Sequence, residues 1–68
     1  MDLEKFLFKN VIVIDTDGIE YRGYVHDFTA DFDNEENEDS ISITTDLKSG
    51  SGVELFASEI KSIKSDVI

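Results

Sequence analysis

Hydrophobic and polar residues alternate along much of the chain with a period of two, the pattern of half-buried β-strands. Residues 19–25 place Ile, Tyr, Gly and Val on one side and Glu, Arg and Tyr on the other, and residues 40–45 and 53–57 repeat the alternation. Residues 11–15, VIVID, are apolar at successive positions instead, which predicts a strand covered on both faces. The pattern therefore predicts a mainly β fold of about five short antiparallel strands.

Helical spacing occurs near both ends of the chain. Residues 2–8 carry apolar side chains on one helical face, which predicts a short helix capped by Asp2 and packed over one open end of the strands. Ser58–Glu59 is expected to form a corner, and the spacing of Ile60 and Ile63 favours a single helical turn before a final strand. The predicted core is formed by the inward positions Leu3, Phe6, Leu7, Val11, Val13, Ile19, Tyr21, Val25, Phe28, Ile41, Ile43, Val53, Leu55, Ile60 and Ile63.

An Asp-x-Asp-Gly sequence follows the apolar strand and has two possible interpretations. In phosphoryl-transfer enzymes of the haloacid-dehalogenase type, such aspartates attack a phosphate and hold magnesium. That chemistry needs a doubly wound sheet with a lysine and a further acidic motif on later strands, whereas here the alternating pattern resumes directly after Gly18. We therefore predict that Asp15 and Asp17 are hairpin residues whose carboxylates accept local backbone hydrogen bonds, and that Gly18 takes a positive φ.

Length and composition narrow the classes of function. A chain of 68 residues forms one small domain, and with no cysteine and one histidine it has neither a disulfide framework nor a zinc motif. Its net charge of -10 opposes binding to nucleic acid or anionic membrane. The N-terminal residues lack a long apolar stretch, so we expect no membrane span and a cytoplasmic location. No arrangement of residues specifies acid–base, nucleophilic or redox chemistry, so neither enzyme activity nor a cofactor is expected.

Residues 27–39, DFTADFDNEENED, are predicted to form an acidic loop. Oxygen-bearing residues alternate in it as in a calcium loop, and the candidate metal ligands are Asp31, Asp33, Glu35 and Asp39. The EF-hand register fails, because Glu36 stands where glycine is needed and Ser42 where glutamate is needed. A solvated loop, a contact surface for a basic protein partner and a weak cation site remain as alternatives.

Two motifs resemble those of the Sm-like (LSm) family. The stretch KNVIVIDTDGIEYRGYVHDF resembles the first Sm motif, in which a strand, an Asp-Gly hairpin and a glycine-containing strand follow a short helix. Gly18, Gly23 and Phe28 occupy the corresponding places. LFASEIKSI resembles the second motif, in which a tight corner leads to an Ile-x-x-Ile pair. The resemblance implies a five-stranded, strongly bent antiparallel SH3-like barrel over residues 1–68.

The resemblance also implies RNA binding, but the residues that perform it in the family differ here. Sm-like proteins grip a base with an aspartate and an asparagine after the bent strand and with an Arg-Gly pair after the fourth strand. This chain has an acidic loop at the first place and Phe56-Ala57 at the second, so a phosphate would meet carboxylates. A divergent RNA-binding protein therefore remains only as the alternative function.

Assembly is the other property that the resemblance implies. In Sm-like proteins the fourth strand of one subunit pairs with the fifth of the next, and VELFA and IKSIK are apolar enough at alternate positions to do so. We therefore expect a protein-interaction or assembly module that self-associates through its strand edges. The candidate interaction residues are Arg22, Tyr24, Phe32, Asn34, Asn37 and Phe56.

Overall fold

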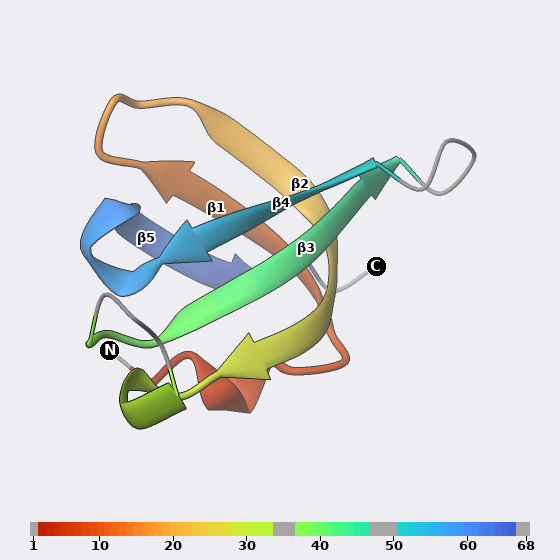
Figure 1. The fold of residues 1–68 in the computed structure, drawn as a ribbon. Helices are drawn as coiled ribbons and strands as arrows, with labels where there is room; N and C mark the ends of the chain where they lie inside the picture. The colour runs from red at the N-terminus through yellow and green to blue at the C-terminus, as the bar shows by residue number, and fades with distance from the viewer. Residues whose placement is uncertain (1, 34–36, 47–50, 67–68) are drawn as a thin grey trace.

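A computed structural model describes residues 2–33, 37–46 and 51–66 of the chain. The described strands are β1 (Asn10–Asp15), β2 (Glu20–Thr29), β3 (Ser40–Asp46), β4 (Ser51–Phe56) and β5 (Ile60–Ser65), shown in Figure 1. Single turns of 3-10 helix precede or join them: η1 (Glu4–Phe6), η2 (Asp31–Asp33) and η3 (Ala57–Glu59).

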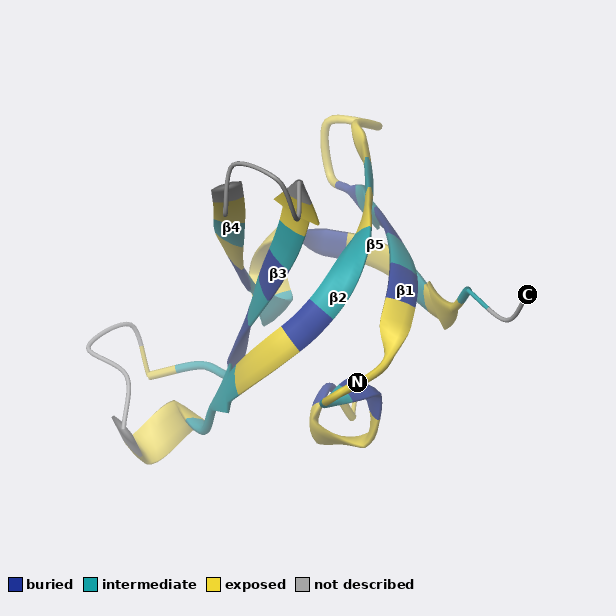
Figure 2. Cartoon of the chain, turned by 90° about the vertical axis from the view of Figure 1, so that its right-hand side faces the viewer, coloured by how far each residue is buried: buried dark blue, intermediate teal, exposed yellow. Residues whose placement is uncertain are grey.

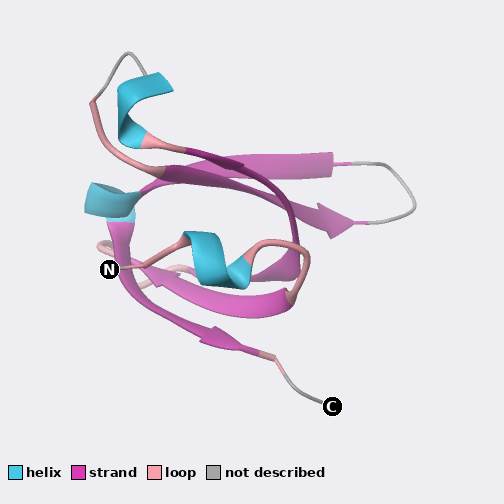
Figure 3. Cartoon of the chain, turned by 90° about the horizontal axis from the view of Figure 1, so that it is seen from below, coloured by secondary structure: helices cyan, strands magenta, loops and turns pink. Residues whose placement is uncertain are grey.

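The strands form one antiparallel sheet in the order β4-β3-β2-β1-β5. The sheet curls strongly, and η1 lies across one end of it (Figure 3). The predicted fold of five antiparallel strands is therefore confirmed. The described strands do not close into a hydrogen-bonded barrel, however, because β4 and β5 are the two edges of the sheet.

Glycine permits the bend in β2. This strand pairs with β1 through residues 20–24 and with β3 through residues 24–29, so it changes partner halfway along its length. A Cβ on Gly23 would collide with the carbonyl oxygen of Thr44 and would lie 2.6 Å from Cγ2 of Ile43. Only glycine lets β3 approach this closely.

Each strand of the curled sheet contributes buried residues to the core (Figure 2). Its buried apolar members are Leu3, Phe6, Val11, Val13, Val25, Ile41, Ile43, Leu55 and Ile60, and its half-buried members include Leu7, Tyr21, Phe28, Val53 and Ile63. The prediction is wrong for Ile19, which is 53% exposed. Ile19 is still part of the hairpin turn, because its N–H donates to the Asp15 carboxylate and β2 begins only at Glu20. Its side chain therefore does not take an inward position of that strand.

The N-terminal helix is shorter than predicted. It covers Glu4–Phe6 instead of residues 2–8, and its N-cap residue is Leu3, without a side-chain cap, instead of Asp2. Phe8 has a φ of 64° and donates its N–H to the carbonyl of Val25 at 2.8 Å. The helix ends early because the Phe8 N–H is bonded to Val25 in β2 and not to the preceding helical turn.

The predicted helical turn at Ile60 and Ile63 is also wrong. The 3-10 turn is η3, and residues 60–65 form β5 along β1. The register of β1 and β5 shifts between Ile14 and Asp15. This irregularity lets isoleucines with a spacing of three both contact the core from a strand.

The acidic segment begins later than predicted. Residues 27–29 belong to β2 and pair with β3, with Phe28 opposite Ile41 and packed against the core. The expected loop over residues 27–39 is thus partly strand, because burying Phe28 favours continued pairing. The turn of η2 then follows at Asp31.

Candidate functional site

The Asp-Gly turn is held together by one carboxylate. Oδ1 of Asp15 accepts hydrogen bonds from the N–H groups of Asp17 and Ile19 at 2.9 and 2.8 Å, and Oδ2 accepts from the Tyr21 hydroxyl at 3.0 Å. The hydrogen bond from the Ile19 N–H is the largest of the effects that together lower the pKa of Asp15. Burial of the carboxylate opposes this shift, and the bonds from the Tyr21 hydroxyl and the Asp17 N–H add to it. Gly18 has a φ of 83°. These contacts confirm the predicted hairpin role of Asp15, with Asp17 contributing its backbone N–H.

Carboxylates also tie the acidic segment to the rest of the fold. Oδ1 of Asp39 accepts from the Asp31 N–H at 2.8 Å, which closes the segment on itself. Oε1 of Glu38 accepts from the Ser58 N–H at 2.8 Å, which joins the segment to η3 and lowers the pKa of Glu38. These acids therefore serve as backbone acceptors across the junction of β2, β3 and η3.

The predicted cation ligands are only partly covered by the structure. Asp31 is exposed and Asp39 is half-buried, while the side chain of Asp33 and all of Glu35 lie outside the described residues. Within the described part of the chain, no group of three or more His, Cys, Asp or Glu residues is placed to hold a metal ion. Cation binding by this segment stays a prediction.

A hollow of about 210 Å³ lies on the outer face of the sheet, and we call it the outer-face groove. Cross-strand pairing builds it in two rows: Ile12 lies between Arg22 and Lys64, and Ile14 lies between Glu20 and Ser62. Both isoleucines are half-buried, so the predicted cover on both faces of β1 is complete on the inner face and only partial on the outer face. The groove therefore has an apolar floor and a polar rim.

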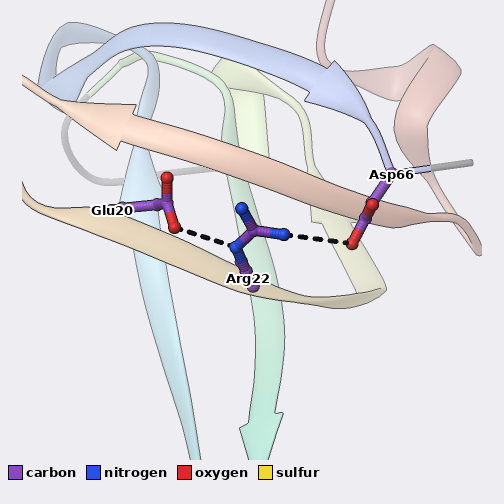
Figure 4. A network of polar contacts seen from close by, with 3 residues as sticks. All are labelled: Glu20, Arg22 and Asp66. Atoms are coloured by element: carbon purple, nitrogen blue, oxygen red, sulfur yellow. Dashed lines mark hydrogen bonds and ion pairs between the residues drawn. The ribbon is translucent and has the colours of Figure 1, made fainter.

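Arg22, Lys64 and Glu20 form the charged rim of this groove. Nε of Arg22 lies 2.8 Å from Glu20 Oε2, and its Nη1 lies 3.9 Å from Asp66 Oδ2 (Figure 4). The hydrogen bond that Arg22 donates to the Glu20 carboxylate raises the pKa of Arg22, which is charged at any physiological pH. More than half of the Arg22 side chain is exposed, at 59%, and exposed ion pairs contribute little net stability. Arg22 can therefore turn to an incoming carboxylate at small cost.

The edge of β4 has free backbone groups at alternate residues. Ala57 donates its N–H to the Asp39 carbonyl at 2.9 Å, so the odd-numbered residues of β4 direct their backbone groups toward β3. Gly52, Glu54 and Phe56 consequently direct theirs outward. The Phe56 N–H is accepted by the Glu59 carboxylate at 3.1 Å, which covers one end of this edge.

The edge of β5 follows the same alternation. Asp66 donates its N–H to the Asn10 carbonyl at 2.8 Å, so Ser62 and Lys64 face β1 with their backbone groups, whereas Ile63 and Ser65 direct theirs outward. Both edge strands, β4 and β5, thus direct backbone N–H and C=O groups away from the sheet at alternate residues.

The structure does not gather the predicted interaction residues into one site. Arg22 lines the outer-face groove, Tyr24 is half-exposed further along β2, and Phe32 is 82% exposed on η2. Phe56 is half-exposed at the end of β4. Asn37 is exposed with a φ of 57°, and Asn34 lies outside the described residues.

Sequence reasoning missed most of the groove. Ile12, Ile14 and Lys64 were not among the candidates, although they lie beside Arg22. The available signal was the apolar run of β1, because a strand with isoleucine on its outward positions needs something to cover it.

Comparisons with known proteins identify no relative: no family model, no curated protein and no solved structure matches the chain. None of the helical turns in the described residues has the length or the apolar character needed to cross a membrane.

Proposed function

We propose that this chain is a divergent Sm-like small barrel that works as a non-enzymatic assembly module, in which β4 of one copy pairs with β5 of the next. The observation that carries the proposal is the open sheet, whose β4 and β5 edges both present outward backbone groups. Unpaired edges are templates for pairing with another chain. The strand order, the glycine-bent β2 and the corner at η3 fit the Sm-like layout and support the same proposal.

Side chains at the two edges suit such pairing. In such a pairing the outward position Glu54 of β4 lies opposite Ile63 or Ser65, the outward positions of β5, so no like charge faces it directly. Opposite charges on neighbouring strands stabilise pairing, whereas like charges destabilise it. Phe56 also projects from the outer side of β4, where a neighbouring subunit would cover its half-exposed ring.

Net charge sets the conditions for assembly. Each copy carries a formal charge of -10, so the copies repel one another at long range. Salt screens this repulsion beyond about 8 Å at physiological ionic strength, but it leaves short-range strand pairing largely intact. We therefore expect association to rise with salt concentration.

A proline variant tests the edge directly. Ser65→Pro removes an outward N–H of β5 without removing a bond to β1, so it should block assembly and leave the monomer folded. Ser65→Ala is the matched control. Sedimentation velocity from low to high salt should show association of the parental and Ser65→Ala chains and none of Ser65→Pro. Equal sedimentation of all three at every salt concentration would exclude the β5 edge.

Phe56→Glu tests the opposite edge. It places a charge where the neighbouring subunit is expected and should abolish salt-dependent association without loss of circular dichroism. A gel-shift titration with oligo-U at low salt separates assembly from the alternative function. Saturable binding there would favour RNA recognition over assembly as the primary role.

A further inference from the structure

The turn η3, which joins β4 to β5, is tied to the rest of the fold on both sides (Figure 1). On one side, the Ser58 N–H donates to the Glu38 carboxylate of the acidic segment at 2.8 Å. On the other side, the carbonyl of Glu59 accepts from the Thr16 N–H of the Asp-Gly turn at 3.0 Å. The backbone of Glu59 is therefore held in place, which defines where its side chain can reach.

The Glu59 side chain reaches back to the edge of β4. Its Oε1 accepts from the Phe56 N–H at 3.1 Å, in an exposed position. Phe56 has the extended backbone of a strand, with a φ of -84° and a ψ of 154°, and its N–H points away from β3. That N–H is one of the groups that a neighbouring strand would bond, and a carboxylate of the same chain already occupies it.

Two physical reasons favour this internal carboxylate over a strand of another copy. A hydrogen bond to a carboxylate is stronger than one to a neutral carbonyl oxygen. The carboxylate also lies only three residues away in the same chain, so its bond does not require the ordering of a second molecule. The bond is exposed, so its net contribution is modest and a pairing strand can displace it.

We propose that the Glu59 carboxylate is an intramolecular plug on the β4 edge, which β5 of a second copy must displace before pairing extends to Phe56. The plug opposes association at the end of β4 that lies next to η3. This inference rests on the proposed assembly and adds a contact that restrains it.

Removal of the plug should strengthen association. Glu59→Ala should lower the dissociation constant of assembly about three- to tenfold in sedimentation velocity at high salt, because one exposed hydrogen bond no longer competes. Glu4→Ala is the matched control, because it removes the same charge from an exposed position on η1, outside both edge strands. Glu59→Gln keeps a side-chain carbonyl that can accept from Phe56, so its dissociation constant should lie between those of the two alanine variants.

Amide exchange of the monomer tests the plug without assembly. In the edge-blocked Ser65→Pro background, the Phe56 amide should exchange about threefold faster, or more, with Glu59→Ala than with Glu59 intact. The Ala57 amide, which donates to the Asp39 carbonyl, is the internal control and should exchange at the same rate in both chains.

Two results would overturn the plug. One is equal exchange of the Phe56 amide in the two chains, and the other is association of Glu59→Ala that is no stronger than that of an assembling Glu4→Ala chain. Faster exchange at Phe56 without association of any variant, at any salt concentration, would instead refute the proposed assembly and support the plug contact itself. The amide spectrum of each variant verifies that the fold is kept.

Discussion

The two faces of β1 differ although their side chains are chemically alike. On the inner face, Val11 and Val13 are fully buried against the other strands and η1. On the outer face, Ile12 and Ile14 are only half-buried between the side chains of neighbouring strands. An apolar residue stabilises the fold only by the area that it removes from water in that fold. The inner face therefore contributes more to stability than the outer face does.

The largest expected effect is on the inner face. Ile43→Ala should reduce the free energy of unfolding by about 2–5 kcal/mol, because Ile43 is fully buried and its loss leaves a cavity. The matched change on the outer face, Ile14→Ala, should cost about 1 kcal/mol, since its side chain already meets water. Urea unfolding of both variants checks the difference. Equal costs would mean that the two faces are not distinct.

The second-largest loss of stability should come from a substitution at Gly23, where β3 lies close against β2. Gly23→Ala should cost about 1–3 kcal/mol, because the new methyl group would collide with the Thr44 carbonyl and the Ile43 side chain. Gly52→Ala is a control on the edge strand, where the closest atom to the new Cβ is the Ile43 carbonyl oxygen at 2.9 Å. Thermal unfolding should rank Gly23→Ala below Gly52→Ala, and the reverse order would contradict the account of the bend.

Acid pH should destabilise the protein by protonating Asp15, the buried last residue of β1. A carboxyl group whose pKa is lowered in the folded state stabilises the protein above its unfolded pKa, and this contribution is lost as the pH falls through the folded pKa. Stability should therefore fall below about pH 4. Asp15→Asn should flatten that part of the profile. Urea titrations between neutral and acidic pH provide the measurement.

The smallest effect on the pH dependence of stability should come from removing the Tyr21 hydroxyl, which donates to the Asp15 carboxylate. Tyr21→Phe removes the donor to Oδ2 but leaves the Ile19 N–H, which is the main cause of the lowered pKa of Asp15. The pH at which stability is lost should therefore rise slightly. If Tyr21→Phe changed the stability profile as much as Asp15→Asn does, the hydroxyl, and not the backbone of the turn, would control the pKa of Asp15.

Much of the fold could be predicted from local pattern. Alternation located β2, β3 and β4, and the Asp-Gly turn was placed correctly. Errors occurred where two interpretations had similar local support. The spacing of Ile60 and Ile63 suits either a helical turn or a strand with a register shift, and only the pairing with β1 selects the strand.

The candidate site was less predictable. Arg22 and Phe32 could be identified as exposed residues of a recognition type, but nothing along the chain indicates that Arg22 and Lys64 lie on either side of Ile12. These residues come together through long-range strand pairing, which periodicity does not encode.

By itself, the sequence determined the strand content, the turn chemistry and the excess of negative charge, because these depend on residues close together along the chain. The tertiary structure decided which apolar face of β1 is buried, where the sheet remains open and which cations surround the outer-face groove. The physical reason is that a strand offers two faces and two edges, and only its packed neighbours determine which of them stay in contact with water.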